Sequence, residues 1–459
     1  MAFNENFISA LHDLLPREEA ERLLNSLGEA PATSVRLNHR KPGIAPDCQQ
    51  VPWCGNGFYL QSRPQFTFDP MLHAGLYYVQ DASSMFIAHI LKHLAADSDV
   101  NYLDLCAAPG GKTTAALDAL SNGSLIVGNE IDNRRAQILR ENIVKWGCPN
   151  CVVTNDNSAK LGKLKEFFDI IATDMPCSGE GMFRKDEEAV AQWSPSLVAQ
   201  CADRQREIAD NILSALKPGG FLIYSTCTFN RRENEEMVDY LVSELGAESV
   251  EIPTIPEWNI MFGIKTANHC YRFMPHRTKG EGLFIAVVQK PEGQRNTIRI
   301  KPQKSKKVVI PKECKGFIGS NYDIDFIATG ELISAIPTAL SERMKFIADN
   351  VHTILCGTPI ATMKGKTIAP EHALALSTML NPEAFASVEL SYGNAMAYLR
   401  GEALALGDAP TGYVVARYNG IPLGFLKNIG NRANNLYPKE YRIRTTYVPS
   451  EPPGIIKTH

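Results

Sequence analysis

The central part of the chain alternates short apolar runs with segments of helical period. Apolar runs that end in polar or small residues are typical of buried parallel strands, and the periodic segments between them are typical of amphipathic helices. The strand-like runs are NYLDLCAA (101–108), SLIVGNEI (124–131), CVVTND (151–156), DIIATDMP (169–176) and FLIYSTC (221–227). This alternation predicts an α/β fold with a largely parallel sheet and helices on both faces.

The elements between and after these runs complete the predicted sheet. The segments 133–147 and 194–220 have a helical period, and both are expected to end at glycine. A further run, EGLFIAVVQK (281–290), predicts a last, antiparallel strand at the edge of the sheet.

The first 75 residues have a different pattern. Apolar residues from Phe7 to Leu15 follow a helical period, and Pro16 opens a second helix in PREEAERLLNSL. SVRLNHRK (34–41) alternates as a half-buried strand does, and SSMFIAHILKHL (83–94) predicts a further short helix. These elements indicate a small α+β module.

The pattern changes again near residue 290. A polar, basic stretch without helical period has the composition of a linker, and the runs GYVVARY, IPLGFLK and YRIRTT further on predict a small barrel-like β domain. The predicted division is an N-terminal α+β module (1–75), a core (76–290), a basic linker (291–315), a mixed segment (316–385) and a β domain (386–459).

Composition narrows the class of protein. A chain of 459 residues with 44% hydrophobic and 21% charged residues is typical of globular proteins. No apolar run approaches the roughly 20 residues of a membrane helix, and the start MAFNENF does not resemble a secretory signal. The 11 cysteines are scattered along the chain, as expected for a protein of the reducing cytoplasm.

The net charge of −3 averages two unlike parts of the chain. Residues 1–290 carry 27 Lys and Arg against 36 Asp and Glu, a balance of −9, whereas residues 291–459 carry 20 against 14, a balance of +6. A basic C-terminal third favours a polyanionic partner, and a chance bias of a solvated surface is the alternative.

The turn in YLDLCAAPGGKTT (102–114) raises the question of its ligand. A phosphate-binding P-loop requires glycine where Cys106 stands, and the dinucleotide fingerprint GxGxxG is absent. The turn therefore reads as a strand, a small-residue loop and a helix that begins near Lys112. In a wound sheet such a loop lies at the carboxyl ends of the strands, where ligands bind.

Acidic residues follow the next strands at the same edge. Glu130, Asp156 and Asp174 end the second, third and fourth runs. A carboxylate after the second strand suits the hydroxyl groups of a ribose, and one after the third can accept from the exocyclic amine of adenine. The alternative for each acid alone is a helix cap or a solvated charge.

Two cysteines belong to the same edge. Cys177 follows the fourth run and Cys227 ends the fifth, so parallel pairing of these strands would bring the two thiols together. A thiolate is a strong nucleophile. Buried packing is the alternative for a single cysteine.

Metal binding is not predicted. Cys148 and Cys151 form a CxxC without a second pair at zinc spacing, and packing in a loop is the favoured interpretation. The ten histidines form no HxxxH or HExxH group, and His276 is expected to be structural.

The motifs LDLCAAPGGK, TDMPCSGEG and YSTCTFNRRENE resemble those of the RNA cytosine-5 methyltransferases of the Sun/nucleolar-protein family. The resemblance extends to PATSVRLNHRK, VQDASSM (79–85) and RFMPHRTKGEGLFIAVVQK (272–290). The C-terminal GFLKNIGNRANNLYPKEYRIR resembles the β domain of the bacterial RsmF-type branch, which modifies small-subunit ribosomal RNA. The likeness is thinnest over residues 316–385.

The resemblance implies a Rossmann-like core that binds S-adenosylmethionine (SAM), a small α+β N-terminal module and a PUA-like RNA-binding β domain. It implies that Cys227 is the nucleophile that adds to cytosine C6 and that Cys177 assists release. Asp174 is placed near both the base and the cofactor, and its assignment stays open. The implied cofactor contacts are Cys106, Ala107, Ala108, Pro109, Gly110, Gly111, Lys112, Glu130, Asp156 and Asp174.

The expected protein is a cytoplasmic, monomeric, SAM-dependent methyltransferase that acts on C5 of a cytosine in RNA, most simply 16S ribosomal RNA or the small ribosomal subunit. Two alternatives stay open. One is a tRNA cytosine-5 methyltransferase with the same chemistry, and the other is a non-catalytic RNA-binding assembly factor. The presence of both cysteines and of all the strand-end acids argues against the second.

The basic C-terminal residues are expected to dock RNA. The cations are Lys427, Arg432, Lys439, Arg442 and Arg444, with Tyr437 and Tyr441 between them. Such spacing offers phosphate contacts and aromatic faces for unpaired bases. A solvated barrel surface is the alternative.

Overall fold

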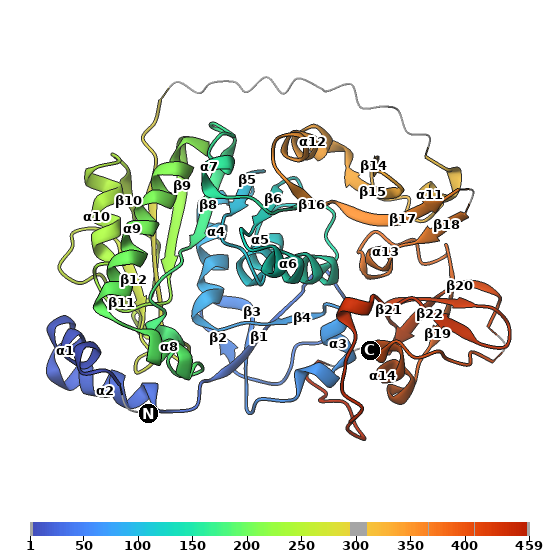
Figure 1. The fold of residues 1–459 in the computed structure, drawn as a ribbon, viewed down its shortest axis with the longest axis horizontal. Coiled ribbons are helices and arrows are strands. Elements are labelled where there is room, and N and C mark those ends of the chain that lie inside the picture. Colours follow the sequence, from blue (N-terminus) through green and yellow to red (C-terminus); the bar gives the residue numbers. More distant parts are fainter. Residues whose placement is uncertain (1–2, 294–309, 366, 408, 457–459) are drawn as a thin grey trace.

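A ten-stranded sheet forms the centre of the molecule (Figure 1). The computed structural model describes residues 3–293, 310–365, 367–407 and 409–456. Along the sheet the strand order is β11-β12-β13-β9-β8-β5-β6-β7-β16, and β10 pairs with β13. The strands are β5 (Asn101–Asp104), β6 (Leu125–Asn129), β7 (Cys151–Thr154), β8 (Phe168–Asp174), β9 (Leu216–Thr226), β10 (Glu248–Val250), β11 (Met261–Phe262), β12 (Cys270–Phe273), β13 (Leu283–Gln289) and β16 (Thr353–Cys356).

The five strands from β5 to β9 pair with one another in parallel, as the sequence predicted. From β5 the chain proceeds outward through β6 and β7 and then returns to β8 on the other side of β5. The order therefore reverses between β5 and β8. In wound sheets, ligands bind at the carboxyl ends of the strands beside such a reversal.

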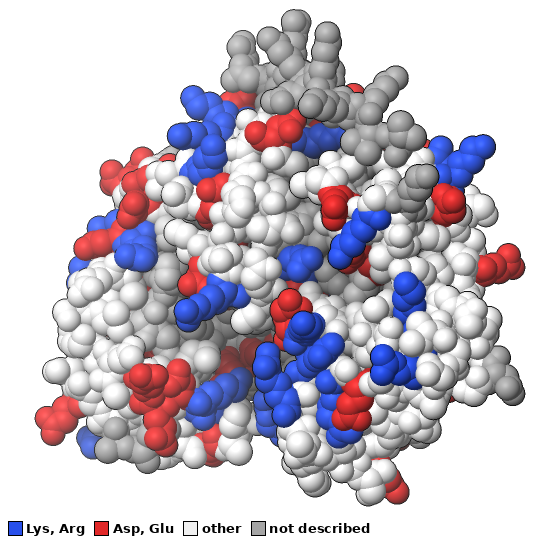
Figure 2. Space-filling view, turned by 45° about the vertical axis from the view of Figure 1, so that its right-hand side comes forward, with Lys and Arg blue, Asp and Glu red and all other residues white. Residues whose placement is uncertain are grey.

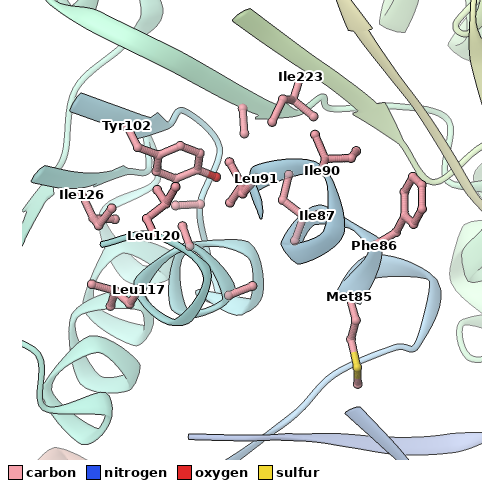
Figure 3. Packing of buried hydrophobic residues seen from close by; sticks show 14 of the residues in the cluster. Met85, Phe86, Ile87, Ile90, Leu91, Tyr102, Leu117, Leu120, Ile126 and Ile223 are labelled. Carbon is pink, nitrogen blue, oxygen red and sulfur yellow. The ribbon is translucent and has the colours of Figure 1, made fainter. Parts of the chain in front are cut away.

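Helices cover both faces of this sheet. On one face, α4 (Phe86–Ala95), α5 (Gly111–Ala119) and α6 (Asn133–Trp146) bury apolar side chains, and Figure 3 shows residues of α4 and α5 close to Tyr102, Ile126 and Ile223 of the strands. The other face carries α7 (Ser158–Leu161), α9 (Pro195–Ile212), α10 (Glu235–Ser243) and α12 (Ser341–Asn350). The short helix α8 (Glu187–Gln192) packs with α1 instead. The predicted α/β architecture is confirmed.

Two details of the predicted core were wrong. The helix expected over 194–220 ends at Ile212, and Gly219 and Gly220 lie inside β9, where the pairing with β8 is irregular. Gly219 has φ +72, a conformation that favours glycine. The two glycines therefore allow the irregular pairing within β9 and do not end a helix. The strand predicted over 281–290 is antiparallel to β9 as expected, but β12 covers its other side, so it is not an edge strand.

The N-terminal helices and strand are present where the apolar pattern predicted them. The helices are α1 (Glu5–Leu14), α2 (Arg17–Leu27) and α3 (Pro70–His73), and an antiparallel sheet of order β2-β3-β1-β4 contains β1 (Thr33–Leu37), β2 (Gln50–Val51), β3 (Cys54–Leu60) and β4 (Tyr77–Val79). Pro16 lies directly before α2 at its N-cap position.

The C-terminal part contains two further four-stranded sheets. The first has the order β14-β15-β17-β18, with β14 (Ile324–Thr329), β15 (Leu332–Pro337), β17 (Thr358–Lys364) and β18 (Thr367–Pro370). The second has the order β19-β20-β21-β22, with β19 (Ala386–Glu389), β20 (Gly412–Tyr418), β21 (Ile421–Asn428) and β22 (Ala433–Asn435). The helices here are α11 (Lys312–Gly316), α13 (His372–Leu376) and α14 (Tyr392–Arg400).

The runs GYVVARY and IPLGFLK form β20 and β21, which confirms two of the three predicted strands. The third, YRIRTT, is wrong: a 3-10 turn (Lys439–Tyr441) precedes residues without strand pairing. Helix α14 was not predicted, although its buried Ala395, Met396 and Leu399 have helical spacing. Most of the linker predicted over 291–315 lies outside the described residues.

In the part of the chain that the structure describes, no helix is long and apolar enough to cross a membrane. The same residues contain no group of three His, Cys, Asp or Glu side chains that could hold a metal ion. Cys148 and Cys151 are both buried in the core beneath α4, α5 and α6, as a packing role requires.

Candidate active site

The loop between β5 and α5 has the conformation that its small residues allow. Gly110 has φ +117 and precedes α5, and a Cβ added there would lie 3.2 Å from Leu139, so a larger residue would be strained. The Thr113 hydroxyl donates to Asp104 Oδ2 at 2.6 Å and ties the start of α5 to the end of β5. Burial, above all other influences, raises the pKa of Asp104 to about 7.

A cavity of about 580 Å³ lies at the carboxyl ends of the parallel strands. This volume is in the range of small-molecule sites. The predicted residues that line it are Cys106, Glu130, Asp156, Asp174, Cys177 and Cys227. Further lining residues, which the sequence analysis did not assign, include Asn129, Ile131, Met175, Arg204 and Ile208. The structure therefore brings the predicted residues from five strand ends together in one cavity.

The rest of the β5–α5 turn, residues 107–112, does not line this cavity. Ala107 N donates to Asn129 O at 2.8 Å, which ties the turn to β6. Burial and then Asp104 raise the pKa of the Cys106 thiol far above its ordinary value. Cys106 is thus a neutral part of the cavity wall and not a nucleophile.

Glu130 offers an unused acceptor to a ligand. It is 2% exposed, and its Oε1 accepts from the backbone N–H of Asp132 at 3.1 Å. Its Oε2 accepts no hydrogen bond from any described residue, and Arg135 Nη1 lies 3.5 Å away. A buried carboxylate oxygen without a donor is unfavourable unless a ligand supplies one. Next to it, Ile131 is 69% exposed and offers an apolar face to the same cavity.

The thiols of Cys177 and Cys227 lie 3.2 Å apart. They come from the loops after β8 and β9, which are parallel neighbours, so the distance follows from strand pairing. The hydrogen bond with Cys227 and then burial raise the pKa of the Cys177 thiol well above its ordinary value. Cys177 therefore keeps its proton near neutral pH and can donate it in a hydrogen bond to a thiolate at Cys227.

Lys112 and Asp174 form an ion pair beside the two thiols. Lys112 Nζ lies 2.7 Å from Asp174 Oδ2. Burial disfavours the charged lysine, but Asp174, and then Asp104 and Cys227, outweigh it and raise the pKa of Lys112 above its ordinary value. Lys112 therefore stays charged, with Asp174 as its partner, within electrostatic range of Cys227, where a cation favours a thiolate.

A buried polar network supports both cysteine loops, and the sequence analysis did not identify it. Glu233 accepts from Ser178 Oγ at 2.5 Å, from Ser178 N at 2.9 Å and from Asn230 Nδ2 at 2.7 Å. Asn230 Nδ2 also donates to Glu180 at 2.9 Å, and Glu180 accepts from Phe229 N at 2.6 Å. Burial raises the pKa of Glu233, and its hydrogen bonds oppose that shift. The sequence signal that could have identified this network was Glu180 in the motif SGEG and Glu233 in the motif NRRENE.

Only some of the basic and aromatic side chains predicted to bind RNA near the C-terminus are exposed to solvent. Lys427, Arg432, Lys439 and Arg444 are exposed, whereas Arg442 is half-buried. Tyr437 is wrongly predicted as a face for unpaired bases, because it is 2% exposed and packs against Tyr398 and His372. Tyr441 is half-buried in the same group.

Three family descriptions match the chain. Residues 91–289 match "16S rRNA methyltransferase RsmB/F", residues 3–82 match the "N-terminal domain of 16S rRNA methyltransferase RsmF", and residues 385–443 match the "Methyltransferase RsmF PUA domain". The first range contains strands β5 to β13 of the central sheet, the second contains the N-terminal sheet, and the third contains the second C-terminal sheet.

Curated relatives match over most of the chain. The "Ribosomal RNA small subunit methyltransferase F" of Aliivibrio fischeri (strain MJ11) is 32% identical over 86% of this chain and 85% of the relative. The protein of the same description from Klebsiella pneumoniae (strain 342) is 31% identical over 89% of each chain, and that from Shewanella loihica is 28% identical over 95% of each.

Solved structures with a similar fold cover about two thirds of the chain. A methyltransferase homologue from Pyrococcus horikoshii has a TM-score of 0.54 at 25% identity and covers 63% of this chain and 96% of its own. NSun6 from the same organism has a TM-score of 0.55 at 20% identity and covers 64% of this chain and 99% of its own.

Proposed function

Because the chain belongs to the family of the ribosomal RNA small subunit methyltransferases F, which use SAM, we propose that it methylates C5 of a cytosine in 16S ribosomal RNA through a covalent bond to Cys227. The observation that carries this proposal is the pair of thiols, 3.2 Å apart in the wall of a cavity that also contains the strand-end acids.

The chemistry of cytosine explains why a thiolate is needed. C5 of cytosine is a weak nucleophile. Addition of the Cys227 thiolate to C6 forms a sulfur–carbon bond and moves the C5–C6 π electrons to C5, which then behaves as the carbon of an enamine. After C5 has received the methyl group, solvent water takes the C5 proton, the C–H electron pair forms the C5–C6 double bond again, and the Cys227 thiolate leaves.

Cys177 is suited to this last step. Since its pKa is raised, it is present as a thiol beside the sulfur that must depart. Its S–H donates a hydrogen bond to the departing thiolate and so stabilises the leaving group. The Lys112 ammonium stabilises the same negative charge, both when Cys227 attacks and when it leaves.

The cavity residues fit SAM. Glu130 has a buried oxygen that accepts no hydrogen bond from the described chain, as a ribose hydroxyl requires, and the exposed Ile131 can pack against an adenine ring. Asp156, which lines the cavity at the next strand end, would accept from the adenine amine. SAM, when bound, supplies the electrophilic methyl group.

The test of the proposed function is transfer of a labelled methyl group to small ribosomal subunits and to naked 16S RNA, followed by bisulfite mapping. We expect the label in 5-methylcytosine of the 16S chain. Label in tRNA alone, or in a base other than cytosine, would contradict the proposal. Binding of ribosomal RNA without any methyl transfer would favour the assembly-factor alternative.

Replacing Glu130 by alanine should weaken the binding of SAM. The ribose would lose hydrogen bonds to a charged acceptor, worth about 1.5–3 kcal/mol, so we expect the dissociation constant in calorimetry to rise by about one to two orders of magnitude. Glu130→Gln keeps one acceptor oxygen and should lie between the wild type and the alanine variant. Unchanged affinity in both variants would remove Glu130 from the cofactor site.

The second C-terminal sheet is proposed to dock RNA. Figure 2 brings the C-terminal side of the molecule forward and shows Lys and Arg side chains gathered beside a hollow in the lower centre of that face. Three exposed cations lie along this segment. Lys427 is near the end of β21, Arg432 directly precedes β22, and Lys439 begins the 3-10 turn after β22. Because the rest of the chain is acidic on balance, these cations are a suitable source of phosphate contacts.

Reversal of Lys427, Arg432 and Lys439 to Glu should therefore weaken RNA binding and reduce its dependence on salt, because each lost phosphate contact lowers the salt slope by about one. Affinity for SAM should not change. The matched control reverses Lys312, Lys315 and Lys364, which are exposed outside that sheet. Equal weakening in both triple variants would show that net charge, and not a local docking surface, controls RNA binding.

A further inference from the structure

One carboxylate oxygen of Asp156, the acid after β7, accepts a hydrogen bond from a distant part of the chain. The donor is the backbone N–H of His352, 2.7 Å from Asp156 Oδ2 and 196 residues further along the sequence. In return, Asn155 N donates to His352 O at 2.9 Å. A reciprocal pair of bonds thus joins the end of β7 to the turn between α12 and β16.

This turn is held rigidly against the core. Strand β16 extends the central sheet antiparallel to β7, with Thr353 opposite Thr154. Helix α12 buries Met344 and Ile347 in the core, and Phe346 stacks on Phe167 with ring centroids 5.0 Å apart. The side chain of Arg343 completes the contact by donating to Asn101 Oδ1 at 2.9 Å. The segment is therefore built into the methyltransferase core.

The bond from His352 determines which way Asp156 faces. The backbone of Asp156 is held by Asn129, which accepts from Asp156 N at 3.1 Å and donates to Asp156 O at 2.9 Å. With Oδ2 engaged by His352, only Oδ1 remains, and it accepts no hydrogen bond that the structure records among the described residues. Asp156 lines the cavity, so its remaining oxygen is available to a ligand there.

We propose that the backbone N–H of His352 is a positioning group, which orients Asp156 so that its free oxygen accepts the adenine amine of SAM. This rests on the proposed function, because it takes SAM as the ligand and Asp156 as its adenine contact. It follows that helix α12 and strand β16, which lie in the stretch 316–385 where the resemblance to the family is thinnest, complete the cofactor site.

A pair of variants at one position isolates the N–H group. His352→Pro removes the donor, and the preceding Val351 has φ −131 and ψ 154, a conformation that is compatible with a following proline. His352→Ala removes the side chain and keeps the donor. Both are made in the full-length chain, alone and together with Asp156→Ala, and SAM binding is measured by calorimetry without RNA.

We expect His352→Pro to raise the dissociation constant of SAM by roughly three- to tenfold, the effect of losing one net hydrogen bond, and His352→Ala to bind as the wild type does. In the Asp156→Ala background the proline should have no further effect, because no carboxylate is left to orient. If the proline variant does not fold, lactate at position 352 replaces the same N–H by an ester oxygen, and its matched control is again His352→Ala.

The outcomes separate this inference from the proposed function. If Asp156→Ala weakens SAM binding and His352→Pro does not, the positioning role is overturned while the adenine contact stands. If the proline weakens binding equally in both backgrounds, its effect is general disruption, and the role is also overturned. If Asp156→Ala leaves SAM affinity unchanged, the adenine contact itself is wrong and the inference falls with it.

Discussion

Replacing Cys227 by alanine is expected to abolish methyl transfer, with a fall in rate of at least about four orders of magnitude, because C5 cannot be activated without a thiolate at C6. SAM binding and the melting temperature should stay close to those of the wild type, since Cys227 is only half-buried and the change removes one atom. The measurement is single-turnover transfer of labelled methyl groups to 16S RNA.

RNA that carries 5-fluorocytidine provides a second measurement for the same variant. The fluorine cannot leave as a proton does, so the wild-type enzyme should stay bonded to this RNA, whereas Cys227→Ala should form no bond that survives denaturing electrophoresis.

The matched control is Cys201→Ala. Burial and then Glu233 raise the pKa of Cys201 to about 11, so it is a neutral thiol near Cys227 that does not line the cavity. Full activity of Cys201→Ala would exclude a general effect of thiol removal. Adduct formation by Cys227→Ala would instead require the roles of Cys177 and Cys227 to be exchanged.

Replacing Cys177 by alanine is expected to have the opposite effect on the covalent intermediate. Addition of Cys227 to C6 should proceed, but elimination should be slow, because the departing thiolate has lost its hydrogen-bond donor 3.2 Å away. A protein–RNA adduct should therefore accumulate on unmodified RNA, visible as a band of reduced mobility in denaturing gels. The double variant Cys177→Ala with Cys227→Ala should show none.

Two results would contradict this assignment. Normal turnover by Cys177→Ala would mean that the thiol has no part in release. An adduct that persists in the double variant would mean that a third residue forms the bond to RNA. The hydrogen bonds of Glu233 to Ser178 and Asn230 provide an independent test of the two cysteine positions. Because these bonds support the loops of both cysteines, Glu233→Gln should displace the two thiols together.

Much of the fold could be predicted from local pattern. The parallel strands β5 to β9 are short apolar runs that end in polar residues, a signal contained within each segment. Prediction failed where local signals compete. Glycine is typical of a helix end, yet Gly219 lies within β9. The alternation in YRIRTT suggested a strand, but this segment pairs with no strand among the described residues. Strand pairing depends on a neighbour that the segment itself does not specify.

The site shows the same division. The sequence by itself determined that Glu130, Asp156, Asp174, Cys177 and Cys227 share one edge, because parallel strands end on the same side of a sheet. Only the tertiary structure decided how these groups are oriented: the bond from His352 to Asp156, the pairing of Lys112 with Asp174 and the network around Glu233 join segments far apart in the chain. Hydrogen bonds and ion pairs form between whichever groups folding brings within about 3 Å, and no periodicity within a segment encodes that distance.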